Sequence, residues 1–298
     1  RLGPGNMTDP ASTQPRHGHL VIVGGGEDRK HDMKVLSRFV ELCGGADSHI
    51  VVVTAASTVH DEMWQVYDRA FGELGVGSRS TLALQGREDA NDPALAEQVL
   101  AADGIFMTGG DQKRLLARIG GTAIDAAMHQ AFKENGACIG GTSAGASAMA
   151  EHMLAAGTRD VLPEAGTAHL AAGLGFLSRV VIDQHFSERQ RLARLLSILA
   201  QNPYLIGVGI DEDTALVIEC DGQLEVVGEG AVTLLDGRQM ASNFLNLGSR
   251  DERLELINVK LHLLPAGVSY RVPRPGAESG PGDAPEALRD ILALVTKM

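Results

Sequence analysis

Runs of consecutive apolar residues alternate along the chain with longer stretches whose apolar residues recur at helical spacing. The runs His19–Val23, His49–Thr54 and Gly104–Met107 predict buried strands, and each leads through a turn into an amphipathic stretch. Helices are expected at about 33–43, 61–75, 93–102, 112–118 and 122–135. Strands that alternate with helices are typical of βαβ units, so the pattern predicts an α/β fold: a parallel sheet in a three-layer sandwich, with helices on both faces.

The same criteria place further elements along the chain. Strands are expected at Ser80–Leu84, Ala137–Ile139, Arg179–His185 and, as one strand or a pair, Leu205–Ile218, with helices from Ser143 and over Glu188–Ala200. Residues 155–178 are expected to form a glycine-containing excursion, and 272–283 are rich in proline and glycine. We expect a disordered N-terminus over 1–17 (1–6 being a cloning remnant), one domain over 18–270, a linker over 271–284 and a C-terminal helix over 285–298.

Composition narrows the function classes. Of the 298 residues, 44% are hydrophobic and 21% charged, which excludes disorder over the whole length. The formal net charge of −12 argues against a nucleic-acid partner. The three cysteines lie far apart without a CxxC pair, which supports neither a metal site nor a disulfide framework and favours the reducing cytoplasm. No stretch approaches the ~18 apolar residues of a membrane span.

The segment Gly141–Gly145 reads Gly-Thr-Ser-Ala-Gly and lies between an apolar strand and an Ala-rich helix. This is the setting of a nucleophile elbow, in which small neighbours let the chain turn sharply and lift the serine hydroxyl out of the sheet. Ser143 is therefore a candidate nucleophile, and the Ala144 N–H a candidate oxyanion donor. The alternative is a Gly/Ser-rich turn that binds a phosphate or nothing.

Two other glycine turns follow predicted strands. Thr108–Gln112 should meet the elbow at the carboxyl edge of the sheet, where Gly110 could supply a second oxyanion N–H; alternatively it is only a helix start with Asp111 as N-cap. Gly24–Gly26 is followed by Arg29 where G-x-G-x-x-G requires its last glycine, so a dinucleotide site is rejected and no cofactor is expected.

A serine nucleophile needs a base, and His185 is the candidate among the ten histidines because it ends an apolar strand. The alternative is a strand-end histidine satisfied by the backbone. Ser187 and Gln190 form a capping box for the next helix, which would place Arg189 in its first turn against the helix dipole. The arginines that follow His185 would suit a carboxylate ligand, or they form a solvated helix face: Arg189, Arg191 and Arg194.

The acid that orients the base is sought in Gly209–Thr214. If this stretch is extended, Glu212 is the lone carboxylate on an apolar face, and a histidine N–H is a natural partner for it, with Asp211 and Asp213 toward solvent. The alternatives are a polar turn or an acidic cation site. Asp160 and Glu164 are the next candidates for the orienting acid.

In combination these motifs resemble the cyanophycinase branch of the serine peptidase family that also contains aspartyl dipeptidase E. The resemblance covers roughly 18–270 and rests on Gly24–Asp28, Thr108–Gln112, Gly140–Ser147, Asp183–Phe186 with the three arginines, and Gly209–Thr214. It implies a glutamine-amidotransferase-like (flavodoxin-like) α/β fold, a Ser143–His185–Glu212 triad, no metal and a cytoplasmic homodimer.

The resemblance also implies a substrate. Cyanophycin has a poly-aspartate backbone with arginine on each β-carboxyl, and this branch hydrolyses it to β-Asp-Arg dipeptides as an exopeptidase. The implied substrate-binding residues are Gln112, Asp183, Gln184, Arg189, Arg191 and Arg194. Residues 272–298 look like an addition to the family core. The alternatives are an aspartyl dipeptidase of the same family and a non-enzymatic flavodoxin-like module that binds an anion.

Overall fold

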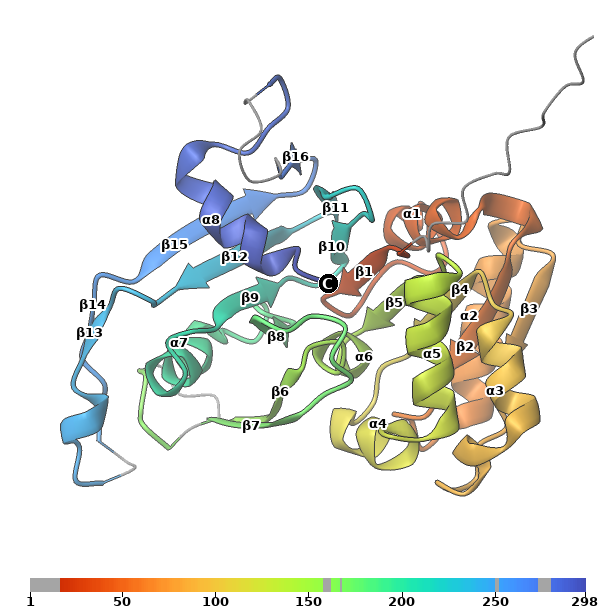
Figure 1. Ribbon diagram of the computed structural model, residues 1–298, viewed down its shortest axis with the longest axis horizontal. Helices are drawn as coiled ribbons and strands as arrows, with labels where there is room; N and C mark the ends of the chain where they lie inside the picture. Colours follow the sequence, from red (N-terminus) through yellow and green to blue (C-terminus); the bar gives the residue numbers. More distant parts are fainter. Residues whose placement is uncertain (1–16, 158–161, 167, 250–251, 273–279) are drawn as a thin grey trace, which may run out of the picture.

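A computed structural model describes residues 17–157, 162–166, 168–249, 252–272 and 280–298 (Figure 1). Its centre is an eight-stranded sheet in the order β16-β11-β10-β1-β5-β4-β2-β3, in which β1, β5, β4, β2 and β3 are parallel and the other three strands are antiparallel. These strands are β1 (Leu20–Val23), β2 (His49–Val53), β3 (Ser78–Thr81), β4 (Gly104–Met107), β5 (Cys138–Thr142), β10 (Thr214–Ile218), β11 (Gln223–Gly228) and β16 (Ser269–Arg271).

Helices cover both faces of this sheet, which confirms the expected three-layer α/β sandwich. On one face, α1 (Lys34–Cys43) and α2 (His60–Glu73) pack an aromatic cluster that includes Phe39, Tyr67 and Phe106 against the strands. On the other face lie α3 (Pro93–Leu100), α4 (Gln112–Ile119), α5 (Ala123–Glu134) and the short α6 (Ala144–Ser147). Consecutive strand residues point to opposite faces, and because helices cover both faces, all four residues of β1 are buried.

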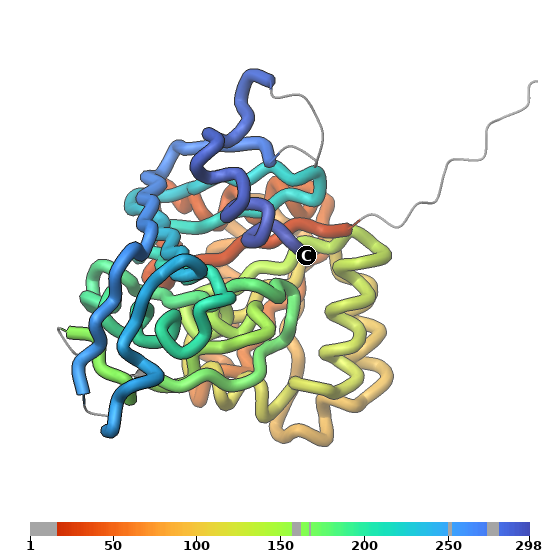
Figure 2. Tube along the Cα trace, turned by 60° about the vertical axis from the view of Figure 1, so that its left-hand side comes forward, coloured from red at the N-terminus to blue at the C-terminus, as the bar shows by residue number. Residues whose placement is uncertain are grey.

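A second sheet lies beside the first, in the order β15-β12-β9-β8. Its strands are β8 (Val180–Gln184), β9 (Ile206–Ile210), β12 (Ala231–Asp236) and β15 (Lys260–Pro265). Helix α7 (Leu192–Gln201) packs on one face. Helix α8 (Glu286–Val295) lies on the other face, where its apolar side joins the hydrophobic core that the two sheets share. Both views draw this dark-blue helix beside the second sheet (Figure 1 and Figure 2).

The stretch 205–218 is the pair of strands that the sequence allowed, and the two strands lie in different sheets because a turn at 211–213 redirects the chain from β9 to β10. Other expected elements differ from the observed ones. The excursion 155–178 overlaps a hairpin of β6 (His152–Gly157) and β7 (Ala168–Ala172), and another small hairpin joins β13 (Ala241–Ser242) to β14 (Leu256–Ile257). Strand β3 also begins and ends earlier than expected.

The helix after His185 begins at Leu192 instead of Glu188, so the expected capping box is wrong. The Ser187 N–H donates to Asp211, and Gln190 has a φ of +51°, which a helix interior does not allow. Arg189 therefore lies in the loop before α7, and the argument from its position in the helix dipole does not apply. In the part of the chain that the structure describes, no helix is both long and apolar enough to cross a membrane.

Candidate active site

Ser143 stands at a sharp turn directly after β5, as the elbow pattern predicts. Its φ and ψ of 53° and −111° lie outside the regions that L-residues commonly occupy. The turn can form because its neighbours are small: a Cβ at Gly141 would come within 2.5 Å of the Gly145 carbonyl oxygen, and a Cβ at Gly145 within 2.4 Å of the Met107 carbonyl oxygen. The Ser143 N–H donates to the Val23 carbonyl at 3.1 Å, which joins the elbow to β1.

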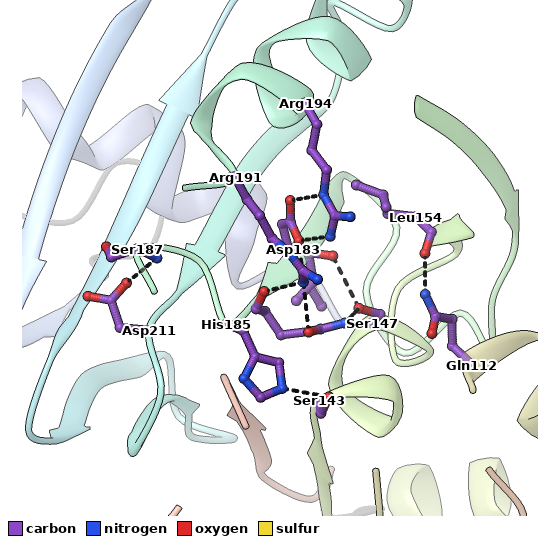
Figure 3. Close-up of polar contacts among 12 residues, drawn as sticks. Gln112, Ser143, Ser147, Leu154, Asp183, His185, Ser187, Arg191, Arg194 and Asp211 are labelled. Carbon is purple, nitrogen blue, oxygen red and sulfur yellow. Dashed lines mark hydrogen bonds and ion pairs between the residues drawn. The ribbon is translucent and has the colours of Figure 1, made fainter. Parts of the chain in front are cut away.

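His185 directly follows β8 and brings its ring to Ser143 (Figure 3). The distance from Ser143 Oγ to His185 Nε2 is 2.9 Å, and that from His185 Nδ1 to Glu212 Oε1 is 2.5 Å. The histidine side chain is 12% exposed and that of Glu212 is 41% exposed. With Nδ1–H donated to the carboxylate, Nε2 is free to accept the serine proton, which is the arrangement of a nucleophile, a base and an orienting acid.

Glu212 reaches His185 from a turn, not from the strand face that the sequence suggested. The expectation that Asp211 and Asp213 face solvent is wrong. Asp211 accepts backbone N–H groups from Ser187 and Ala231, and Asp213, at a φ of +45°, accepts that of Asp28. The two aspartates therefore hold the turn that presents Glu212.

The other two candidates for the orienting acid stand apart from this arrangement. Glu164 forms a β-bridge with Arg253, and Asp160 lies outside the described residues.

The Gly24–Gly26 turn cradles the histidine and the glutamate, a role that sequence reasoning missed. Gly25 has a φ of +95°, and a Cβ there would lie 2.3 Å from His185 Cε1. Gly26 has a φ of +59°, and its Cβ would lie 3.1 Å from Glu212 Oε2. The three consecutive glycines after a buried strand were the available signal, because they allow backbone to approach side chains closely.

The second glycine turn also lies against the elbow. A Cβ at Gly109 would be 3.5 Å from that of Ser143, and Gly110, at a φ of +142°, has no room for a Cβ beside the Ala56 carbonyl oxygen. The same turn starts α4, where the Asp111 carboxylate accepts the N–H groups of the first turn. Asp111 is thus the N-cap of α4, and the same glycine turn also lies beside Ser143.

Most of the residues expected to bind substrate contact one another instead. Asp183 is fully buried, and its carboxylate receives the Arg194 guanidinium through two hydrogen bonds and that of Arg191 at 3.4 Å (Figure 3). Arg191 also donates to the carbonyl and side-chain oxygens of Gln184. Burial lowers the pKa of Arg191 to about 10, although Asp183 opposes this. With no exposed surface, Asp183 cannot bind substrate directly in the way that the resemblance implied.

The remaining polar candidates differ in how fully they are engaged. The Gln112 amide donates to the Leu154 carbonyl at 2.9 Å, and the buried Gln184 amide to Ser147 Oγ at 3.3 Å. Arg189 is half-buried, and within the described residues its guanidinium has no hydrogen-bond partner. Arg189 is thus the arginine of the three that remains available to a ligand. No group of three potential metal-ligating side chains occurs among the described residues.

The comparisons with known proteins identify the family of the chain. The model of "Peptidase family S51" matches residues 20–226, a span that contains Ser143, His185 and Glu212. The chain belongs to peptidase family S51. Membership of this family makes it a serine peptidase, and its elbow, histidine and glutamate have the arrangement that serine peptidase chemistry requires.

Relatives within the S51 family are similar over most of their length. Cyanophycinase from Geminocystis herdmanii is 37% identical over 251 residues, which cover 84% of this chain and 92% of the relative. Cyanophycinase from Synechococcus elongatus is 37% identical over 270 residues, with coverage of 89% and 84%. The crystal structure of a peptidase from an acI-B1 actinobacterium superposes with a TM-score of 0.62 at 25% identity and covers 86% of this chain and 97% of that one.

Proposed function

We propose that this serine peptidase hydrolyses cyanophycin to β-Asp-Arg dipeptides through a Ser143–His185–Glu212 triad. The observation that carries the proposal is the continuous hydrogen-bonded line from Ser143 Oγ through the His185 ring to Glu212. The similarity to cyanophycinases over most of the chain supports the substrate.

The geometry suggests how the residues share the reaction. Ser143 Oγ attacks the scissile carbonyl carbon while its proton passes to His185 Nε2, and Glu212 stabilises the resulting imidazolium. The N–H groups of Ala144 and Gly110 are the proposed donors to the oxyanion. Collapse of the intermediate expels the amine, which takes the proton from His185, and water then hydrolyses the acyl-enzyme by the same route.

Substrate selection is assigned to the groups that the protein leaves accessible. Arg189 lies four residues after the proposed base, and its guanidinium, which has no hydrogen-bond partner in the described part of the chain, suits a carboxylate of the poly-aspartate backbone. Asp183, Arg191 and Arg194 contact one another and are proposed to support the chain around Arg189. Gln112 and Gln184 are proposed to support this region without being accessible ligands, because their amides donate to the Leu154 carbonyl and to Ser147 Oγ.

The experiment is incubation of the purified protein with cyanophycin, with identification of the products by mass spectrometry. Soluble β-Asp-Arg dipeptides are expected from the wild type, and Ser143→Ala should lower kcat by several orders of magnitude, since the best-studied serine peptidase loses about 10⁶ on loss of its nucleophile.

Three outcomes contradict separate parts of the proposal. Free arginine as the product excludes main-chain cleavage. Hydrolysis of Asp-X dipeptides without attack on the polymer identifies an aspartyl dipeptidase. Near wild-type turnover by folded Ser143→Ala excludes this nucleophile.

We further propose that the enzyme is a cytoplasmic homodimer. Strand β15 is the edge of the second sheet, and Leu261 and Leu263 on it are 53% and 61% exposed, which supports pairing of this edge with a second copy. Sedimentation equilibrium should give twice the chain mass for the wild type and the single-chain mass for Leu263→Lys. A wild-type monomer would exclude the dimer.

A further inference from the structure

Glu27 is a buried carboxylate for which the proposed reaction has no use. It is 3% exposed and directly follows the Gly24–Gly26 turn. One of its oxygens accepts the Thr142 hydroxyl at 2.7 Å, and the other accepts the Tyr67 hydroxyl. Burying a carboxylate is costly unless its oxygens have partners, so these two hydrogen bonds explain how Glu27 can be buried there. The bond from Thr142 also joins Glu27 to the residue that precedes Ser143.

The segment that carries Glu27 already connects the backbones of all three triad loops. The Val23 carbonyl accepts the N–H of Ser143 at 3.1 Å, and that of Gly24 accepts the N–H of His185 at 2.7 Å. The Gly25 carbonyl accepts the N–H of Asp213, the residue after the proposed acid, at 2.9 Å. These are main-chain contacts. Glu27 adds a side-chain contact from the same segment to the elbow.

The far side of Glu27 is held by a rigid aromatic core. Tyr67 is fully buried, and its ring centroid lies 5.1 Å from that of Phe106 and 6.1 Å from that of Phe71. Burial raises the pKa of Tyr67 well above its usual value, with a smaller contribution from Glu27, so its hydroxyl remains a donor. The carboxyl group is therefore fixed between the core and Thr142.

We propose that Glu27 is a positioning residue that holds Ser143 in its reactive conformation through the Thr142 hydroxyl. The inference rests on the proposal that Ser143 is the nucleophile. The φ and ψ of Ser143 are unfavourable, and such a conformation persists only where the surroundings over-determine it. Without the bond to Glu27, the end of β5 can relax and move Ser143 Oγ away from His185 Nε2 while the fold remains.

The test measures the reactivity of Ser143 without any peptide substrate, as the rate of labelling by a fluorophosphonate. Thr142→Val removes the hydroxyl at nearly constant volume and should slow labelling roughly 10- to 100-fold, the loss that small misplacements of reacting groups cause. Hydrolysis should lose a similar factor in kcat with little change in KM. Thr142→Ser, which keeps the hydroxyl, should stay close to wild type.

Variants of the glutamate give the matching series. Glu27→Met, of similar volume, should be as slow as Thr142→Val, whereas Glu27→Gln keeps an oxygen for Thr142 and should recover most of the rate. Tyr67→Phe removes a bond to the same carboxyl but leaves the one to Thr142 intact. It should lower the melting temperature and leave labelling within a few-fold of wild type.

The outcomes separate this inference from the proposed function. Wild-type labelling by folded Thr142→Val overturns the positioning role, as does a loss in Thr142→Ser equal to that in Thr142→Val. Because Thr142→Val carries the decision, failure of Glu27→Met to fold does not weaken the test. Labelling of Ser143→Ala at the wild-type rate overturns the nucleophile itself and this inference with it. Inactivity on cyanophycin with normal labelling affects only the substrate proposal.

Discussion

Ser143 and His185 both occupy backbone conformations with positive φ, at 53° and 47°. Each stands where a strand ends and its chain turns sharply toward the other residue. Such conformations are unfavourable for residues with a Cβ, and their coincidence at two interacting side chains is typical of functional sites. At the scale of single residues, the site is built from strained polar residues and from glycines that make room for them.

Gly25 offers a direct test of this arrangement. In Gly25→Ala the new Cβ would collide with the His185 ring, so we expect kcat to fall by at least tenfold as the base moves from Ser143. Gly75→Ala is the matched control, because Gly75 has a similar φ of +86° with open space around it. Both variants should lose stability by roughly 1 kcal/mol from the strained backbone, measured by urea unfolding. Equal activity of the two would contradict the cradle.

Two neighbouring acids of the Glu212 turn should differ in their effects: one on activity and the other on stability. Glu212→Gln should lower kcat by roughly 10²- to 10⁴-fold with little change in melting temperature, because a neutral amide no longer orients the imidazole. Asp211→Asn should instead lower the melting temperature, since Asp211 accepts two backbone N–H groups. Steady-state kinetics and thermal unfolding of both variants measure this. An active Glu212→Gln enzyme would remove Glu212 from the triad.

At the scale of elements, the buried pair of Asp183 and Arg194 joins β8 to α7 across the loop that contains His185. Arg194→Ala would leave the Asp183 carboxylate buried without its principal partner, so unfolding should become easier by about 3–5 kcal/mol in urea titrations. Arg189→Ala, from the loop before the same helix, should leave stability unchanged. Unaltered stability of Arg194→Ala would contradict the structural role of the pair.

Arg189 should matter for activity on the polymer, although it does not matter for stability. Arg189→Ala should lower kcat/KM on cyanophycin by about one to two decades, the value of a charge-assisted contact of roughly 1.5–3 kcal/mol. Arg189→Lys should recover only part of this loss, because lysine lacks the planar fork. Neutral ester substrates, hydrolysed by the triad alone, should be unaffected. Intact polymer cleavage by Arg189→Ala would remove the argument that this residue recognises a carboxylate.

The turn that leads into α1 should confer a pH-dependent share of stability. Backbone N–H groups of Met33, Lys30 and His31 donate to Asp28 and lower the pKa of its carboxyl to about 2. Because the folded pKa lies below the unfolded one, the stabilisation is complete above the unfolded value and is lost as pH falls toward 2. The difference in melting temperature between wild type and Asp28→Asn should therefore be constant from pH 5 to 7 and shrink at pH 3. A difference that persists at pH 3 would contradict this origin.

At the scale of the whole molecule, α8 belongs to the same core as the peptidase domain, although its sequence looks like an addition. Leu292 is fully buried in the cluster that also holds residues of β9, so Leu292→Ala should reduce the free energy of unfolding by about 2–5 kcal/mol. Leu245→Ala, at a leucine that is 92% exposed, is the control and should change it little. Urea denaturation followed by circular dichroism measures both. Equal effects would mean that α8 folds apart from the core.

Local patterns were sufficient for the elements that lie within one layer. The strands around β1, β2 and β4 were predicted within a residue or two because a parallel strand buried on both faces is a continuous apolar run. The elbow was also predictable because its small residues are adjacent in sequence, although at Gly145 it is the distant Met107 carbonyl that leaves no room for a Cβ. The start of the helix after His185 was predicted wrongly because Ser187, in the first predicted turn, donates its backbone N–H to Asp211, 24 residues away.

The sequence thus indicated which residue types form the candidate site and their order along the chain, whereas tertiary packing determined which of these residues contact one another. Strand alternation suggested Glu212, but the structure presents it from a turn between two sheets, and that turn exists because Asp211 and Asp213 bind distant backbone. Asp183 and Arg194 were taken as ligands of a substrate; tertiary contact pairs them with each other, since a buried charge requires a counter-charge and both are buried. The glycines of the Gly24–Gly26 turn were visible in the sequence, but their role as a cradle was not, because a glycine's lack of a side chain acquires meaning only when another residue fills the space.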